Sequence, residues 1–408
     1  MQTLYSNNEN KSIEKINILL NHAYNKEKSF QLEVKMKIRY FDNAATTPIL
    51  EQVLIKMFPY LTNAYGNASA MYGIGRMSKK AIEEARIEVA NIINAKPKEI
   101  YFTASGSESD NTALKGFAYA NKEKGKHIIT SKIEHHAVLE SCETLQHQGY
   151  EVTYLNVDKD GIVDLNELTN TIRPDTILIS VMFANNEIGT IQPIEEIARI
   201  AKSKNIIFHT DAVQAVGNVA IDVEKLGIDM LSMSAHKLGG PKGVGALYVR
   251  NGISFEKYIN GGHQEKNKRA GTENVAGIVG LGEACKLSRE NLRDHIKYLT
   301  SLRDYYIKRI LDEIPNTKVN GSLEKRLPGN ANISFTGKDA QELLFKLDEV
   351  GICASSGSAC NTGIQAPSHV LTAIGLTSKE AGSALRTTFG ENNTLDDIDF
   401  LIESLKKL

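Results

Sequence analysis

The chain has few cysteines, almost no net charge and no long apolar segment. Among its 408 residues only four are cysteine (Cys142, Cys285, Cys353 and Cys360), which excludes a disulfide-built scaffold and is typical of a reducing compartment. The 48 basic and 49 acidic residues give a net charge of −1, and without a basic block neither nucleic acid nor a membrane surface is an expected partner. No apolar run is long enough to cross a bilayer, and the N-terminus lacks the apolar core of a signal peptide. We therefore expect a cytoplasmic location.

Composition and length indicate a globular protein with two domains, because 41% hydrophobic and 24% charged residues are ordinary values and 408 residues exceed one simple core. The first part of the chain is rich in Asn, Lys and Glu, and we treat residues 1–36 as an N-terminal extension. Four of its apolar residues would share one helical face: Ile13, Ile16, Leu20 and Ala23. Two interpretations stay open, namely that the functional chain starts near Met36 or that the extension is a helix packed on the body. An intact mass of protein from its native source separates them.

Strand and helix patterns alternate from residue 78 onward. The expected elements are a helix over 78–95, a strand–turn–helix unit over 99–120, strands at 127–131 and 152–157, a strand within 176–189, a helix over 194–205 and a strand over 206–212. Strands that alternate with helices form right-handed crossover units, so we predict a mainly parallel sheet covered by helices on both faces. After about residue 290 the pattern changes, and a long helix over 294–314 introduces a smaller mixed domain.

Ligands of such sheets bind beyond the carboxyl ends of the strands, so the residues that follow each strand are the informative ones. In "TASGSESD", Gly106 and Ser107 lie where a helix begins, and its free N–H groups and dipole suit a phosphate. Ser and Asp are also ordinary N-caps. In "EHH", His135 can stack on a flat ring or shuttle protons, although a lone histidine is more often structural.

Two further strand ends carry polar side chains. The adjacent asparagines of "ANNEIG" can donate to a carboxylate or close an Asx turn. Asp211 directly follows an apolar strand, with Gln214 three residues later. A carboxylate in that position is costly without a partner, and a protonated pyridine nitrogen would be one. The alternative is an N-cap for the next helix.

The segment "SMSAHKLGGPKG" offers a reactive lysine. Lys237 follows a strand directly, beside Ser234 and His236, whereas the Gly-Gly-Pro turn carries Lys242 away from the strand end. A lysine amine in a desolvated position has a lowered pKa and can form a Schiff base with an aldehyde. A phosphate cradle, a ring-stacking histidine, an acid for a ring nitrogen and a Schiff-base lysine together match the needs of pyridoxal 5′-phosphate.

A second reactive group is the thiol of "GICASSGSACNTG". Cys360 lies among Gly and Ser, which predicts a thiol that can reach a partner, although such a cysteine can also be incidental. Cys353 follows the apolar "VGI" and fits the structural role of a buried cysteine. A metal site from Cys353, Cys360 and His369 matches no common zinc spacing. A Cys–His hydrolase would leave the cofactor residues unexplained.

Nine motifs together resemble the NifS/IscS-type cysteine desulfurases, which belong to the class V aminotransferase group of pyridoxal-phosphate enzymes. They are "YFDNAATTP", "TASGSESDNTALKG", "SKIEHHAVL", "NNEIGTIQPI", "HTDAVQAVG", "SAHKLGGPKGVGALYVR", "RAGTEN", "ASSGSACNTG" and "ALRTTFG". The resemblance covers the chain from about Met36 to the end. It implies the α/β architecture of fold type I: a large domain over 51–291 with a mainly parallel seven-stranded sheet flanked by helices, and a smaller α/β domain from 37–50 and 292–408.

The resemblance also implies a role for each site residue. Lys237 would hold the cofactor and move the substrate's α-proton, His135 would stack on the ring and assist proton transfer, and Asp211 and Gln214 would contact the ring nitrogen and hydroxyl. The phosphate would be held by Gly106, Ser107 (usually Thr in the family), Ser234 and His236. Thr272 would reach the phosphate in the other subunit, which implies a homodimer. Asn186 and Arg386 would bind the substrate carboxylate, because the arginine fork can bond both oxygens.

The activity implied is removal of sulfur from L-cysteine. The products would be L-alanine and a persulfide on Cys360, which an acceptor protein would receive, such as an iron–sulfur scaffold or a thiolation enzyme. No metal is implied beyond a transient contact of Cys360 with an iron–sulfur cluster. The alternatives are a selenocysteine lyase, another enzyme on the same fold such as an aminotransferase, or an inactive scaffold for sulfur-transfer partners.

Overall fold

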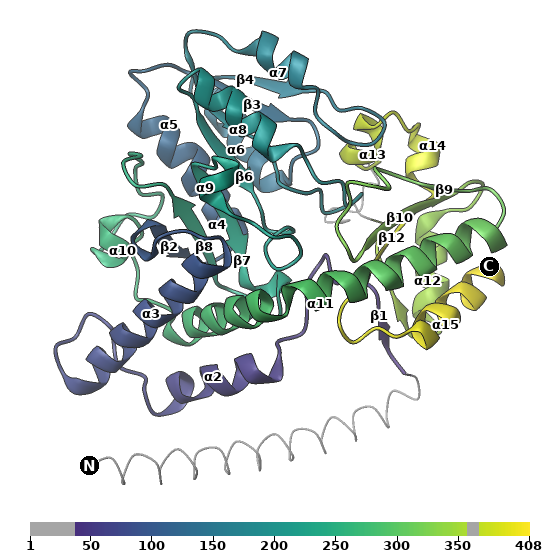
Figure 1. Cartoon of the computed structure of the whole chain (residues 1–408), viewed down its shortest axis with the longest axis horizontal. Coiled ribbons are helices and arrows are strands. Elements are labelled where there is room, and N and C mark those ends of the chain that lie inside the picture. Colours follow the sequence, from purple (N-terminus) through teal and green to yellow (C-terminus); the bar gives the residue numbers. More distant parts are fainter. Residues whose placement is uncertain (1–36, 357–366) are drawn as a thin grey trace.

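The structure is a computed structural model that describes residues 37–356 and 367–408 (Figure 1). The N-terminal extension, with its predicted helical face and the alternative start at Met36, lies outside the described residues, and so does Cys360. In the two described ranges, no helix is both long enough and apolar enough to cross a membrane.

A seven-stranded sheet forms the centre of the larger part of the molecule. Its strands are ordered β2-β8-β7-β6-β5-β3-β4. Their bounds are β2 (Ile100–Thr103), β8 (Gly245–Val249), β7 (Met230–Ser234), β6 (Ile207–Asp211), β5 (Thr176–Ser180), β3 (His127–Ser131) and β4 (Glu151–Leu155). Only β8 runs antiparallel to its neighbours, so the predicted mainly parallel seven-stranded sheet is confirmed.

Helices cover both faces of this sheet, as the alternating pattern predicts. The helices of this part are α2 (Glu51–Thr62), α3 (Gly73–Ile92), α4 (Gly106–Asn111), α5 (Phe117–Ala120), α6 (His136–His147), α7 (Leu165–Thr171), α8 (Ile194–Ser203), α9 (Val223–Leu226) and α10 (Gln264–Asn267). Ile129 of β3 packs in one apolar cluster with Val89 of α3, whereas the adjacent Ile128 packs in another with Leu145 of α6. Successive strand residues point to opposite faces, so both faces are buried.

The smaller part is built on a three-stranded antiparallel sheet with the order β12-β10-β9. Its elements are β9 (Thr317–Val319), β10 (Asn330–Phe335), α12 (Ala340–Asp348), β11 (Ile352–Cys353), α13 (His369–Ala373), α14 (Ser378–Ala381), β12 (Ala384–Thr388) and α15 (Leu395–Lys406). The short strand β1 (Arg39–Tyr40) pairs with β11, so the start of the described chain belongs to this part. Its apolar cluster joins Phe41, Ile333 and Leu401.

One long helix, α11 (Val275–Glu313), runs through both parts (Figure 1). The sequence pattern predicts only the second half of this helix, over 294–314. The first half carries no helical signal because "VAGIVGLGEAC" is apolar on nearly all sides and has no amphipathic period. Leu281 in the first half packs in the core of the large sheet, and Tyr306 in the second half packs in the core of the small part. The domain division at 291/292 stays a prediction. It is supported by the packing of the two halves of α11 in different apolar clusters.

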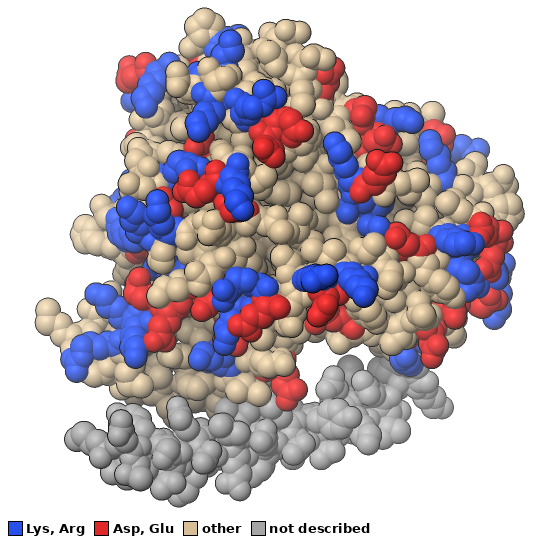
Figure 2. All heavy atoms as spheres, in the orientation of Figure 1, with Lys and Arg blue, Asp and Glu red and all other residues tan. Residues whose placement is uncertain are grey.

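The surface carries both signs of charge. Figure 2 shows Lys and Arg interspersed with Asp and Glu on the face that it draws. This agrees with the net charge of −1.

Candidate active site

The carboxyl ends of the central strands bring predicted site residues together. Asp211 ends β6, Lys237 closes the short 3-10 turn after β7, and His135 directly precedes α6. Segment 42–47, between β1 and α2, lies against these ends. The carbonyl oxygen of its Ala44 accepts hydrogen bonds from Lys237 Nζ (2.5 Å) and Gln214 Nε2 (2.9 Å).

The amine of Lys237 is held in an environment that favours its neutral form. Burial and the nearby Arg386 lower its pKa to about 8, and Asp211 and Asp42 offset part of this effect. Its side chain is half-buried, whereas Lys242 beyond the Gly-Gly-Pro turn is exposed. The turn requires its glycines, because Gly239 has a φ of +77° and a Cβ on Gly240 would lie 2.8 Å from the Cβ of Ala235. An amine with a pKa near 8 is a competent nucleophile and proton acceptor at neutral pH.

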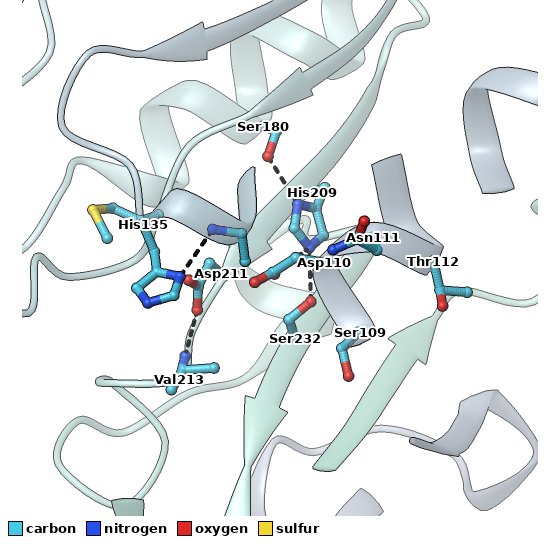
Figure 3. A network of polar contacts seen from close by, with 12 residues as sticks. Ser109, Asp110, Asn111, Thr112, His135, Ser180, His209, Asp211, Val213 and Ser232 are labelled. Atoms are coloured by element: carbon cyan, nitrogen blue, oxygen red, sulfur yellow. Dashed lines mark hydrogen bonds and ion pairs between the residues drawn. The ribbon is translucent and has the colours of Figure 1, made fainter. Parts of the chain in front are cut away.

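His135 and Asp211 lie side by side in this site (Figure 3). His135 Nδ1 accepts from the N–H of Ala137 at 3.1 Å, so Nε2 carries the proton of a neutral ring. Burial lowers the pKa of His135. Asp211 is 5% exposed, and its Oδ1 accepts from the N–H of Val213 at 2.9 Å. Burial raises the pKa of Asp211, and His135 and Lys237 partly offset this. His135 is also the N-cap of α6, which is a structural role, whereas no helix begins directly after Asp211, so the N-cap alternative for Asp211 is wrong.

The predicted phosphate residues meet at the start of α4 and the end of β7. Gly106 is buried, and a Cβ on it would lie 2.6 Å from a methyl group of Val213 and 3.5 Å from the Cβ of Ser234. The N-cap is Ser105, whose side chain accepts from the N–H of Glu108. Within the described chain, the N–H groups of Gly106 and of the exposed Ser107 have no acceptor.

His236 lies beside this region. Its Nδ1 is 3.1 Å from Thr46 Oγ1. Burial, together with the two nearby lysines, lowers the pKa of His236 to about 4, so the ring is neutral.

Thr272 does not lie with the other predicted site residues of the same chain. It is exposed and lines a small hollow of about 150 Å³ together with Arg269 and Gly243. Its loop is anchored by Glu265, whose carboxylate accepts from both terminal nitrogens of the buried Arg86 at 2.7 and 2.8 Å. Contact of Thr272 with the phosphate in a second subunit stays a prediction.

Arg386, on β12, is 5% exposed and points toward the same region. Its Nη2 donates to Asp42 Oδ1 at 2.6 Å, and its Nη1 donates to the backbone oxygen of Asn186 at 3.1 Å. Its Nε is buried and has no partner among the described residues. The guanidinium therefore keeps an unused donor for an incoming carboxylate.

A cavity of about 730 Å³ adjoins this site from the other side of segment 42–47. Lys237 and Gln214 line it, but His135, Asp211 and Arg386 do not. The reactive groups thus lie at the edge of this cavity rather than inside it. Over the described ranges, no group of three or more His, Cys, Asp or Glu side chains is arranged to hold a metal ion.

Comparison with known proteins identifies the family. The model of the aminotransferase class-V family matches residues 39–401. The chain belongs to this family. Among curated class-V relatives, the cysteine desulfurase IscS of Methanosarcina thermophila is 53% identical over 91% of this chain and 92% of its own. The cysteine desulfurase IscS of Clostridium botulinum (strain Hall) is 52% identical over 90% of this chain and 94% of its own.

Solved structures of class-V relatives agree in fold. A NifS-like protein has a TM-score of 0.86 at 37% identity and covers 91% of this chain and 99% of its own. A NifS-like protein from Rickettsia africae has a TM-score of 0.82 at 32% identity, with the same coverage. The resemblance drawn from the nine motifs and the fold that it implied are confirmed.

Three residues of this class-V site escaped sequence analysis: Asp42, Asp110 and His209. Asp42 stands in "YFDNAATTP" but its partner Arg386 is far away in the chain. His209 lies two residues before Asp211 on β6, and a period of two places both side chains on one face of the sheet. Asp110 lies one helical turn after Gly106. The strand period of two could have predicted His209, and the helical period could have predicted Asp110.

Proposed function

We propose that this protein is a cysteine desulfurase that uses pyridoxal 5′-phosphate to remove sulfur from L-cysteine, giving L-alanine and a persulfide on Cys360. The observation that carries the proposal is the amine of Lys237, whose pKa is lowered to about 8 beside Asp211, His135 and Arg386. The cysteine desulfurases among its relatives, at about half identity over most of the chain, support the same activity.

The residues present fit the cofactor. Asp211 keeps one carboxylate oxygen beyond the bond to Val213 for a ring N–H, and the buried Gly106 leaves room for close approach of a phosphate to backbone N–H groups. His135 lies beside Asp211 as a flat, neutral ring. When bound, pyridoxal 5′-phosphate supplies an aldehyde that condenses with an amine and a ring that withdraws electrons from the α-carbon.

The chain's own residues then divide the work. Lys237 Nζ, held by the carbonyl oxygens of Ala44 and Ala45, accepts the α-proton of the substrate and later returns one. Arg386 binds the substrate carboxylate with its unpaired Nε and a terminal nitrogen. Asp211 keeps a negative charge at the ring nitrogen, and His135 holds a proton on Nε2 for transfer.

The sulfur step needs the thiolate of Cys360. It attacks the substrate sulfur, an S–S bond forms, and the carbon–sulfur bond breaks with its electron pair on carbon, which takes a proton to give alanine. The thiol of Cys360 must therefore reach the substrate first and the acceptor protein afterwards. The Gly- and Ser-rich sequence around Cys360 suits this requirement, because such residues restrict the backbone little. We propose a cytoplasmic iron–sulfur scaffold or thiolation enzyme as acceptor, to be checked by following labelled sulfur from the persulfide.

The function is tested by measuring the alanine and sulfide that the protein releases from L-cysteine under reducing conditions. We expect Cys360→Ser to lower the rate by more than about tenfold, because a hydroxyl is a far weaker nucleophile than a thiolate. The matched control is Cys353→Ser, since this half-buried thiol on β11 has no role in the proposal and should keep its rate. An unimpaired Cys360→Ser enzyme contradicts the proposal, and activity on selenocysteine alone favours a selenocysteine lyase.

We also propose that the protein is a homodimer. The chain between α2 and α3 and the flanking turns expose six large apolar side chains: Leu61, Tyr65, Met71, Tyr72, Ile74 and Met77. Several large apolar side chains exposed within one short part of the chain are typical of a protein interface. A second copy would cover it and would bring its own Thr272 to this subunit's cofactor. Sedimentation equilibrium should give twice the chain mass of 44.9 kDa, and Met71→Asp should shift the protein toward monomer.

A further inference from the structure

Behind Asp211 lies a second buried carboxyl group that the proposed function does not use. Asp110, on α4, is 1% exposed, and Figure 3 shows it beside Asp211 and His209. Its Oδ1 lies 3.8 Å from His209 Nε2 and makes no hydrogen bond within the described chain. Two carboxyl groups and one imidazole are therefore buried close together under the ends of β6 and β7.

The imidazole of His209 does not supply a positive charge to this space. It is fully buried between two serine hydroxyls, with Nδ1 2.9 Å from Ser180 Oγ and Nε2 3.0 Å from Ser232 Oγ. A hydroxyl can donate to one ring nitrogen and accept from the other, so a neutral ring is fully satisfied. Burial lowers the pKa of His209 to about 3.

The other ionisable groups around Asp110 are acidic. Asp211 approaches from β6, and the buried Glu134 approaches from the turn before α6. Burial raises the pKa of Glu134 to about 8, although Ser131 and the N–H of Met182 donate to it. Lys237 and His135 face Asp211 and not Asp110.

The proton must therefore reside on Asp110. An ionised carboxyl buried without a cation costs several kcal/mol, and two neighbouring carboxyl groups do not both ionise in such a site. Asp211 has two groups that favour its charge, namely the N–H of Val213 and the nearby amine of Lys237. Over the described ranges, the group that favours the charge of Asp110 is the hydroxyl of Ser232.

We propose that Asp110 is a positioning residue that stays a neutral acid and, with the neutral His209, leaves Asp211 as the single negative charge behind the cofactor's ring nitrogen. The part about the cofactor rests on the proposed function. The protonation of Asp110 does not, because it follows from burial and neighbours within this chain.

Infrared difference spectra of the purified full-length protein test the protonation directly. The carboxylic-acid C=O band seen at neutral pH should lose one component in Asp110→Asn, and Glu134→Gln is the matched control that should remove a different component. Nitrogen NMR of histidine-labelled wild type should show His209 as a neutral ring from pH 5 to 8, values that bracket neutrality. No band lost in Asp110→Asn, or an imidazolium at His209, overturns the proposal.

The positioning role is tested by cofactor binding followed through its absorbance. Asp110→Asn keeps the shape and the neutral state, so the affinity for pyridoxal 5′-phosphate and the pH dependence of its absorbance should change by less than about threefold. Asp110→Ala opens a gap that admits water next to Asp211, and the affinity should fall by about tenfold or more. Equal losses in both variants overturn the positioning role. If the proposed function is wrong, neither the wild type nor the Asp110 variants bind pyridoxal 5′-phosphate. The infrared and NMR measurements still report the protonation of Asp110 and His209 in that case.

Discussion

Replacing Lys237 with alanine is expected to lower the rate of alanine formation from L-cysteine by about 10⁴-fold, the upper range for loss of a positioned proton-transfer group. Among the residues that the structure describes, no second amine lies there, because Lys242 is exposed beyond the Gly-Gly-Pro turn. Borohydride reduction followed by peptide mass analysis should find pyridoxal phosphate covalently attached to Lys237 in wild type and to no residue in Lys237→Ala.

The matched control for this variant is Lys242→Ala, which should keep both the rate and the covalent attachment. The pH gives a second signature. Only the neutral amine reacts with an aldehyde, so the rate of cofactor uptake by wild type should rise about tenfold per pH unit below the pKa of about 8 and level off above it. Attachment of the cofactor in Lys237→Ala, or an uptake rate that still climbs well above pH 8, contradicts the assignment.

The central sheet was predictable because its strands are buried on both faces. The strand at 127–131 (HIITS) has two adjacent isoleucines with polar residues on either side, and the structure buries all five of its residues. Local sequence decides such a strand, since neither face can tolerate water. The first half of α11 was not predictable by the same reasoning, because a helix buried on all sides has no period to detect.

The site was predictable where a residue follows a strand and was missed where two distant segments meet. Asp211 and Lys237 follow β6 and β7 directly, so strand position alone pointed to them. The pair Asp42–Arg386 joins positions at opposite ends of the described chain, and no local pattern carries such a contact. Assignments that depend on a partner molecule, such as Thr272, need a second subunit.

Arg386→Ala is expected to lower kcat/KM for L-cysteine by about 10²-fold or more, through KM, because each of the two charge-assisted bonds to the substrate carboxylate is worth about 1.5–3 kcal/mol. Asp42 and the carbonyl of Asn186 hold the terminal nitrogens of the guanidinium, and Nε has no partner within the described part of the chain. Steady-state kinetics over a range of L-cysteine concentrations measure the change.

Arg386→Lys separates charge from geometry. It keeps the positive charge but not the planar fork, so we expect an intermediate loss of about tenfold. Because α-carboxylate binding and cofactor binding are distinct, the amount of pyridoxal phosphate that each variant retains, measured after release by denaturation, should be unchanged in both variants. The control is Arg309→Ala, which removes a surface arginine of α11 that pairs with Asp399, and its kinetics should match wild type. An unchanged KM in Arg386→Ala would assign the substrate carboxylate to another residue, and Asn186 would be the next candidate.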